Sequence, residues 1–471
     1  MKVTIANSQS YTKILTVWRS NPISIGRRSH CHPVHSPDIA ATMNRLGTAG
    51  DATTRTVEEA RIIEFLLLGG WVDDLRRGGR PAAVEATRAA LNRWVEAGLP
   101  VAGDDSGVRH YDPVEVLNFM KWAGLHEDDP FWSARYLTTG RGFVLRQDAG
   151  WAEAGEPGDP ALLPPRQFEV SFQRTFNLAS IRPGTSIRLR LPLPLEGTSL
   201  DDLRIDLDDA DPSIQFGVTP GRLEARLQAP DMPLQTLGYR ASFTARPYSE
   251  GAGRAAALDA EEAELYTRPV EGFIRVTARV AALAEELAGG LAAPPDAAQA
   301  FWDYLTDRMI CGAVHYHEID AGRPMDWLLD HGWYDCEIGA ALLVSLCRAR
   351  GIPARIVSGY MLYKPAPTYH FWAEIWLGRW VPFDLLSWDL SSGGRDGAWR
   401  GIFAGKLDYR MTVQRLPRYF VGPMSVRLPR RWHVLTQALK DGIRMGIHDI
   451  DSGALAFSDD ISVDDGDQAP G

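Results

Sequence analysis

The segment HGWYDCEIGAALL, residues 331–343, places a cysteine at the start of an apolar run. Cys336 follows Asp335, and aspartate favours the N-cap position, so we expect the thiol in the first turn of a helix. Free backbone N–H groups and partial positive charge at a helix N-terminus stabilise a thiolate and can bind an oxyanion. The negative charge of Asp335 opposes this effect. The thiol therefore needs a base that can become a cation.

A candidate base and acid lie in YHFWAEIWLGRWVPFD, residues 369–384, which has the pattern of a β-hairpin. A two-residue turn that begins at Gly378 would place Asp384 on the face away from His370. A three-residue loop over residues 376–378 ends in glycine, as this loop type favours, and would place His370 directly opposite Asp384. We predict the second register, because it brings the imidazole and the carboxylate together.

These three residues have the types that acyl transfer requires. His370 would take the proton of Cys336, and Asp384 would orient the ring and stabilise its positive charge. The sulfur would then attack an amide or ester carbonyl, and water or an amine would resolve the acyl-enzyme. Taken singly, a strand histidine and a turn-side acid are more often structural or solvated, so the prediction depends on the three together.

Aromatic residues flank this set. Trp333 and Tyr334 precede the nucleophile, and Trp372 lies two positions after His370 on the same strand face. We expect these three to line a substrate groove or to contribute to the oxyanion site, although core packing explains Trp372 equally well. Asp389 is the alternative third member if the hairpin has a different register.

Hydrophobic periodicity divides the chain into blocks that position these residues. Residues 56–147 read as helical, and residues 166–250 alternate apolar and polar side chains, which predicts a small antiparallel β-sandwich or barrel. Helices followed by alternating strands over residues 271–395 predict an α+β domain. Residues 396–450 form a C-terminal extension of no predicted role.

Both ends of the chain read as irregular. Residues 1–42 are basic, with only a short apolar stretch, and we interpret them as a disordered leader or as sequence that precedes a true start at Met43. Residues 451–471 carry six acids and no base, which predicts a solvated, disordered tail.

Composition excludes several classes of protein. The 471 residues carry a net charge of −10, and no basic stripe indicates a nucleic-acid partner. No apolar run approaches the length of a membrane span. Four cysteines without a CxxC pair predict reduced thiols in a cytoplasmic protein. The HYHE segment, residues 315–318, reads as a polar loop, and we expect neither a metal nor a cofactor.

The order of motifs resembles the transglutaminase-like superfamily. The segment CEIGAALLVSLCRARGIPARIVSGY begins at Cys336, and the segment HFWAEIWLGRWVPFD begins at His370 and ends at Asp384. The resemblance extends over residues 271–389. It implies a papain-like core in which these three residues are nucleophile, base and orienting acid.

One departure concerns the approach to the nucleophile. Many members of that superfamily have glycine two positions before the cysteine, whereas here Gly332 is four positions before it. The resemblance implies a thiol hydrolase, peptidase or transglutaminase-type acyltransferase that acts on peptide-like amides. The alternatives are an acyltransferase that forms amide bonds from a thioester in natural-product biosynthesis, and a non-enzymatic scaffold with a vestigial core.

Overall fold

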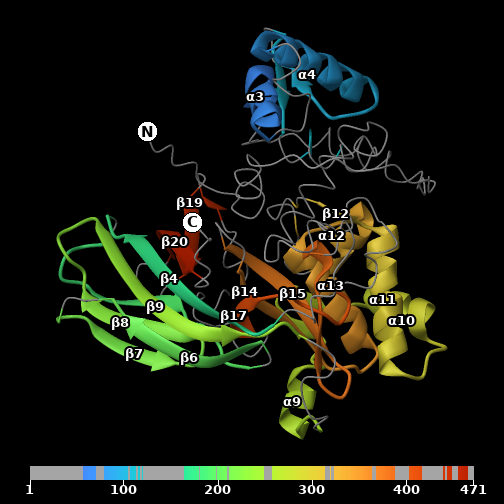
Figure 1. Cartoon of the computed structure of the whole chain (residues 1–471). Coiled ribbons are helices and arrows are strands. Elements are labelled where there is room, and N and C mark those ends of the chain that lie inside the picture. Colours follow the sequence, from blue (N-terminus) through green and yellow to red (C-terminus); the bar gives the residue numbers. More distant parts are fainter. Residues whose placement is uncertain are drawn as a thin grey trace.

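The computed structural model describes residues 57–69, 79–119, 164–387, 403–415 and 439–464, with short gaps inside most of these ranges (Figure 1). The expected leader, residues 1–42, lies outside the described residues. Within the described part, no helix combines the length and apolar character needed to cross a membrane.

The N-terminal unit contains helices and a small sheet. Its elements are β1 (Val57–Glu58), α3 (Glu59–Gly69), α4 (Gly79–Glu96), β2 (Ala102–Gly103) and β3 (Arg109–Tyr111). The strands form an antiparallel sheet in the order β1-β3-β2. This block was expected to be helical. Its strands β2 and β3 lie in a glycine- and aspartate-rich connector, a composition that disfavours helix.

Two sheets form the β module that follows. Its elements are β4 (Arg166–Asn177), β5 (Ser186–Pro192), β6 (Leu200–Leu207), β7 (Gln215–Thr219), β8 (Arg222–Gln228) and β9 (Leu234–Ala245). One sheet contains β4, β9 and β6, and the other has the order β5-β8-β7. In β4 the apolar residues are buried at alternate positions. The buried side chains of both sheets form one apolar cluster.

The C-terminal segment corrects the expectation of a disordered tail. Residues Ala454–Asp464 form β20, which pairs antiparallel with β4 from Phe457–Phe176 to Asp464–Glu169. The strands β18 (Leu439–Lys440) and β19 (Ile443–Ile447) extend the same sheet. Phe457 and Ile461 are buried on one face of this strand, and Asp459, which lies between them on the same face, forms an ion pair with the fully buried Arg174 at 2.6 Å. An acid-rich segment can therefore form a strand when one acid neutralises a buried cation.

The third part is the α+β domain. Its helices are α9 (Ala260–Leu265), α10 (Ala278–Ala288), α11 (Pro294–Arg308), α12 (Pro324–His331) and α13 (Cys336–Ala349). Its main sheet has the order β16-β15-β14-β17, with bounds Trp380–Phe383, Thr368–Trp376, Ala354–Met361 and Arg410–Arg415. Short pairs join β10 (Val270–Glu271) to β11 (Ile274–Arg275) and β12 (Ile310–Cys311) to β13 (Trp333–Tyr334).

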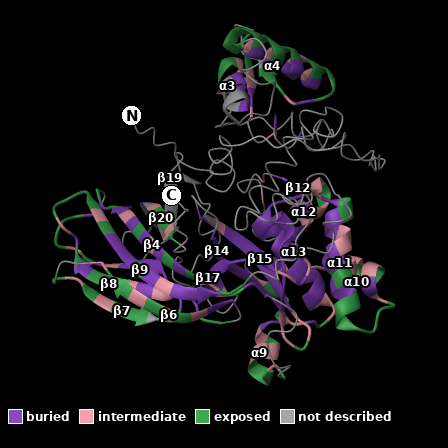
Figure 2. Ribbon diagram, in the orientation of Figure 1, coloured by how far each residue is buried: buried purple, intermediate pink, exposed green. Residues whose placement is uncertain are grey.

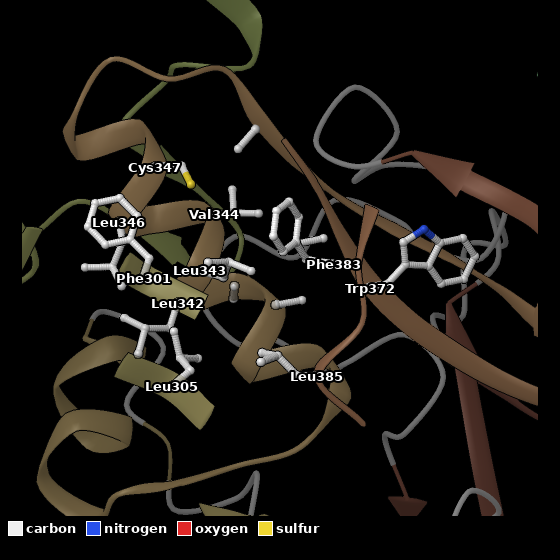
Figure 3. Close-up of a cluster of buried hydrophobic side chains, with 14 of the residues drawn as sticks. Phe301, Leu305, Leu342, Leu343, Val344, Leu346, Cys347, Trp372, Phe383 and Leu385 are labelled. Atoms are coloured by element: carbon white, nitrogen blue, oxygen red, sulfur yellow. The ribbon is translucent and has the colours of Figure 1, made fainter. Parts of the chain in front are cut away.

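Helix α13 is the centre of this domain. It is buried along almost its whole length, as are β14 and β15 (Figure 2). Leu342 and Leu346 face Phe301 of α11, and Phe383 of the hairpin packs near Val344 (Figure 3). A helix with apolar residues on all of its sides is stable only inside such a core.

The domain extends past residue 395, where the sequence pattern had predicted its end. Strand β17 pairs antiparallel with β14 and completes the sheet. Tyr409 and Met411 belong to the apolar cluster of the β module, and the Tyr409 hydroxyl bonds to the Pro164 carbonyl. Residues 409–415 are therefore shared by the β module and the α+β domain.

Candidate active site

The start of α13 positions the candidate nucleophile. Asp335 has an extended backbone, and its Oδ1 accepts hydrogen bonds from the amides of Glu337 at 3.0 Å and Ile338 at 3.1 Å. Cys336 is the first helical residue, as predicted. The cap also uses two of the free N–H groups that we had expected to bind an oxyanion.

The surroundings of Cys336 favour the neutral thiol. Burial raises its pKa well above the usual value, and the charges of Asp335 and Glu337 add to this, while a hydrogen bond with the backbone of Phe371 lowers it. The sulfur therefore lies beside β15, one residue from His370. A neutral thiol in this position requires a base before it can attack.

Glu337 is buried next to the nucleophile. Burial raises the pKa of this carboxyl well above the usual value, and the charge of Asp335 raises it further. Its Oε2 has no hydrogen-bond partner among the described residues. Cys311 is buried as well, on β12, where it pairs with Tyr334 of β13.

The hairpin register differs from the prediction by two residues. Trp376 pairs with Trp380, so the loop is Leu377–Arg379 with Gly378 in the middle, at a φ of +81°. The rings of Trp376 and Trp380 meet edge to face at a centroid distance of 5.4 Å. This aromatic pair stabilises the observed register.

The shift by two preserves the strand face, and the acid still reaches the base. Asp384 follows the last residue of β16, and its Oδ1 lies 2.8 Å from Nε2 of His370. Both side chains are buried, with exposures of 1% for His370 and 0% for Asp384. The carboxylate caps the helical turn of residues 385–387, since Ser387 donates its amide to Oδ1 and its hydroxyl to Oδ2.

A buried arginine from another strand completes this network. Nη2 of Arg410, on β17, lies 3.1 Å from Oδ2 of Asp384 and 3.0 Å from the Ser387 hydroxyl. Burial alone would raise the pKa of Asp384, but His370, Arg410 and the Ser387 amide hold that pKa well below its usual range. The carboxylate is therefore ionised throughout the physiological range.

The other nitrogen of His370 is available. Nδ1 has no hydrogen-bond partner in the described part of the chain, and this includes Cys336. Because Nε2 faces a carboxylate, the ring holds its proton on Nε2 and leaves the Nδ1 lone pair free. Nδ1 is thus the ring nitrogen at which this imidazole can accept a proton.

The flanking aromatic residues have separate positions. Trp333 belongs to the apolar cluster of the N-terminal unit, together with Ile62 and Leu91. Tyr334 lies against the first turn of α13, where a methyl group on Gly339 would reach its ring. The ring of Trp372 is 6.1 Å from that of His370 and lies on the other side of the sheet from Phe383 (Figure 3). Their roles in a groove or oxyanion site stay predictions.

Two motifs fall outside the described residues, namely Asp389 and the HYHE segment, residues 315–318. Among the residues that are described, no group of histidine, cysteine, aspartate or glutamate side chains could hold a metal ion. Ser387 and Arg410 were not predicted from the sequence. Ser387 stands at the third position after a capping aspartate, which is a usable signal. No spacing rule connects Arg410 to Asp384.

The comparisons with known proteins agree with this architecture. Residues 281–385 match the model of the transglutaminase-like superfamily. This segment is therefore similar to a transglutaminase-like domain. The transglutaminase-like segment includes Cys336, His370 and Asp384, whereas Arg410 lies beyond it. No curated protein matches the sequence.

Several solved structures resemble the chain at low identity. The "Putative Cysteine Protease" of Cytophaga hutchinsonii is 15% identical, with a TM-score of 0.36, and the match covers 63% of this chain and 99% of that one. The periplasmic domain of TgpA from Pseudomonas aeruginosa is 20% identical, with a TM-score of 0.30 and coverage of 51% and 96%.

Proposed function

We propose that the chain is a cysteine-dependent acyl-transfer enzyme, with Cys336 as nucleophile, His370 as base and Asp384 as orienting acid. The observation that carries the proposal is the state of His370. Its Nε2 is bound to an ionised carboxylate at 2.8 Å, while Nδ1 has no partner in the described structure. A structural histidine in a buried site would normally have both ring nitrogens satisfied.

The chemistry follows from this arrangement. Nδ1 of His370 takes the thiol proton as Sγ of Cys336 attacks the carbonyl carbon of a peptide-like amide. The imidazolium then returns the proton to the leaving amine, which departs as the thioester forms. Water yields a hydrolysis product, and a second amine yields a new amide. Since Asp335 occupies the amides of Glu337 and Ile338, we propose the amide of Cys336 as the helix-tip donor to the oxyanion.

Cysteine labelling tests the proposal with an internal control. Burial raises the pKa of both Cys336 and Cys347. Without a base to remove the thiol proton, iodoacetamide should therefore react slowly with both. A working base should make Cys336 react at least about tenfold faster at neutral pH, and His370→Ala should remove the difference. Equal labelling of the two in the unaltered protein would refute the proposal and favour a non-enzymatic scaffold.

A second measurement narrows the substrate. Incubation of the active protein with a lysate, followed by acid quench, should leave a thioester adduct on Cys336. Mass spectrometry of that peptide gives the mass of the acyl group, and the Cys336→Ser variant serves as the control.

A further inference from the structure

Arg410 contacts the candidate acid from outside the transglutaminase-like segment. Its side chain is completely buried, and Nη2 lies 3.1 Å from Oδ2 of Asp384. The same nitrogen lies 3.0 Å from the hydroxyl of Ser387, which itself donates to that oxygen. Arg410 and Ser387 therefore hold the carboxylate oxygen that does not face the imidazole.

The donors around Asp384 saturate both of its oxygens. Oδ1 accepts from His370 and from the Ser387 amide, and Oδ2 accepts from the Ser387 hydroxyl and from Arg410. A carboxylate has about four acceptor positions, so none is left over. Rotation of the carboxylate would break several of these bonds at once. The position of Oδ1 opposite His370 is thus determined by contacts on the far side of the group.

A second acid balances the charge of the arginine. Nη1 of Arg410 forms an ion pair with Asp408, which is also buried. Two carboxylates and one guanidinium carry one net negative charge, and this charge lies beside the imidazole. With Asp408 absent, Arg410 would cancel the charge of Asp384, and a buried imidazolium would lack a counter-ion. The Asp408–Arg410 pair therefore holds Asp384 in place and leaves its negative charge available to stabilise a protonated His370.

The backbone explains how Arg410 reaches this position. The β14–β17 ladder has a bulge between Ser358 and Gly359, and a Cβ atom on Gly359 would lie 2.2 Å from the carbonyl oxygen of Met411. On either side of Arg410, Tyr409 and Met411 belong to the apolar cluster of the β module. The β module thus holds the strand whose arginine faces the other way, into the candidate site.

We propose that Arg410 is a positioning residue that orients Asp384 toward His370, with Asp408 as its charge-balancing partner, and that the β module keeps it in place through β17. This inference rests on the proposed function, because orientation of the acid matters only if His370 acts as the base.

The test compares Arg410→Gln with Arg410→Lys and with Arg174→Gln. Arg174 is the matched control, since it is also fully buried and paired with a single strand aspartate, Asp459, in the β module. Labelling of Cys336 by iodoacetamide should fall on the order of 10- to 100-fold in Arg410→Gln. It should recover in part in Arg410→Lys and stay within about twofold of the unaltered protein in Arg174→Gln.

A second readout follows the hydrogen bond itself. In protein labelled with ¹⁵N-histidine, the signal that disappears in His370→Ala reports the tautomer of that ring. The unaltered protein should show a proton on Nε2 that exchanges slowly with solvent, and Arg410→Gln should lose that protection. If Arg410→Gln does not fold, the same signal is measured in Arg410→Lys. The Nε2 proton of His370 should then exchange with solvent faster than in the unaltered protein, and unchanged exchange would contradict the proposal.

The outcomes separate the two proposals. Unchanged labelling together with an unchanged Nε2 proton in Arg410→Gln would overturn the positioning role. A loss of equal size in Arg174→Gln would also overturn it, because the effect would then be general destabilisation. If Cys336 of the unaltered protein shows no preferential labelling, the proposed function fails, and the histidine signal still decides whether Arg410 orients the acid.

Discussion

Nε2 of His370 lies 2.8 Å from Oδ1 of Asp384, although the two residues are not cross-strand partners. The imidazole is held by β15, whereas the carboxylate caps the turn that begins where β16 ends. The pair therefore depends on the residue at which the hairpin stops and the helical turn starts.

Asp384→Asn should destabilise the protein in a pH-dependent way. The folded pKa of Asp384 is lowered, while an unfolded aspartate has a pKa of about 3.9. Its stabilisation is therefore complete above that pH and is lost as the pH falls through the folded pKa. We expect the free energy of unfolding, measured in urea, to fall by about 3 kcal/mol at pH 7. The difference from the unaltered protein should become smaller below about pH 4.

The exposed Asp330, paired with Arg279, provides the control. Asp330→Asn should change stability by less than about 0.5 kcal/mol at either pH. A deficit in Asp384→Asn that grows toward acid pH would contradict the assigned charge state.

Gly359→Ala should displace β17. A side-chain carbon there meets backbone rather than a flexible side chain, so the strand must move or the bulge must close. We expect a loss of about 2 kcal/mol in thermal or urea unfolding, together with slower labelling of Cys336. Gly217→Ala, at a strand position with open space around it, should alter neither. Wild-type labelling in Gly359→Ala would mean that the sheet tolerates a shifted β17.

Asp459→Asn should lower the free energy of unfolding far more than Asp460→Asn, although the two acids are adjacent. Asp459 neutralises the buried Arg174, with bonds of 2.6 and 2.8 Å, whereas Asp460 is exposed. Removal of one partner of a buried ion pair costs about 3–5 kcal/mol. Equal unfolding midpoints for the two variants would argue against the pairing of β20 with β4.

The buried pair of Arg355 and Glu374 should show strong coupling in a double-mutant cycle. Nη2 of Arg355 lies 2.6 Å from Oε2 of Glu374, and the guanidinium carbon is 3.8 Å from the centroid of Trp380. Arg355→Met alone leaves a buried carboxylate and should cost about 3 kcal/mol or more. Adding Glu374→Leu should restore much of this loss. Additive losses in the double variant would show that the pair does not interact.

The parts of the site that depend on local rules could be predicted from the sequence. Asp335 before Cys336 predicted the helix start, and apolar alternation predicted the strand that carries His370. The face shared by His370 and Asp384 was also predicted, because side chains alternate with a period of two. The predicted register of the hairpin was wrong, because a glycine indicates that a loop is present but not which position of the loop it occupies.

The remaining parts depend on contacts between distant segments. Asp459 and Arg174 are 285 residues apart in the sequence. The contact with the buried Arg174 explains why an acidic C-terminal segment forms a strand. Arg410 follows Asp384 by 26 residues, with no motif to connect them. Buried charges pair with groups that the fold brings close together, whatever their separation in the sequence. No periodic pattern in the sequence therefore indicates the Asp459–Arg174 pair or the Asp384–Arg410 pair.

The shared position of β17 has a consequence for biosynthesis. A ribosome releases Cys336, His370 and Asp384 before it releases Arg410, and the β-module strands β4–β9 have emerged earlier still. A nascent chain that ends near residue 395 would hold all three candidate catalytic residues but lack the fourth strand of their sheet. The proposed thiol chemistry should therefore begin late in translation, after the segment that joins both modules has left the exit tunnel.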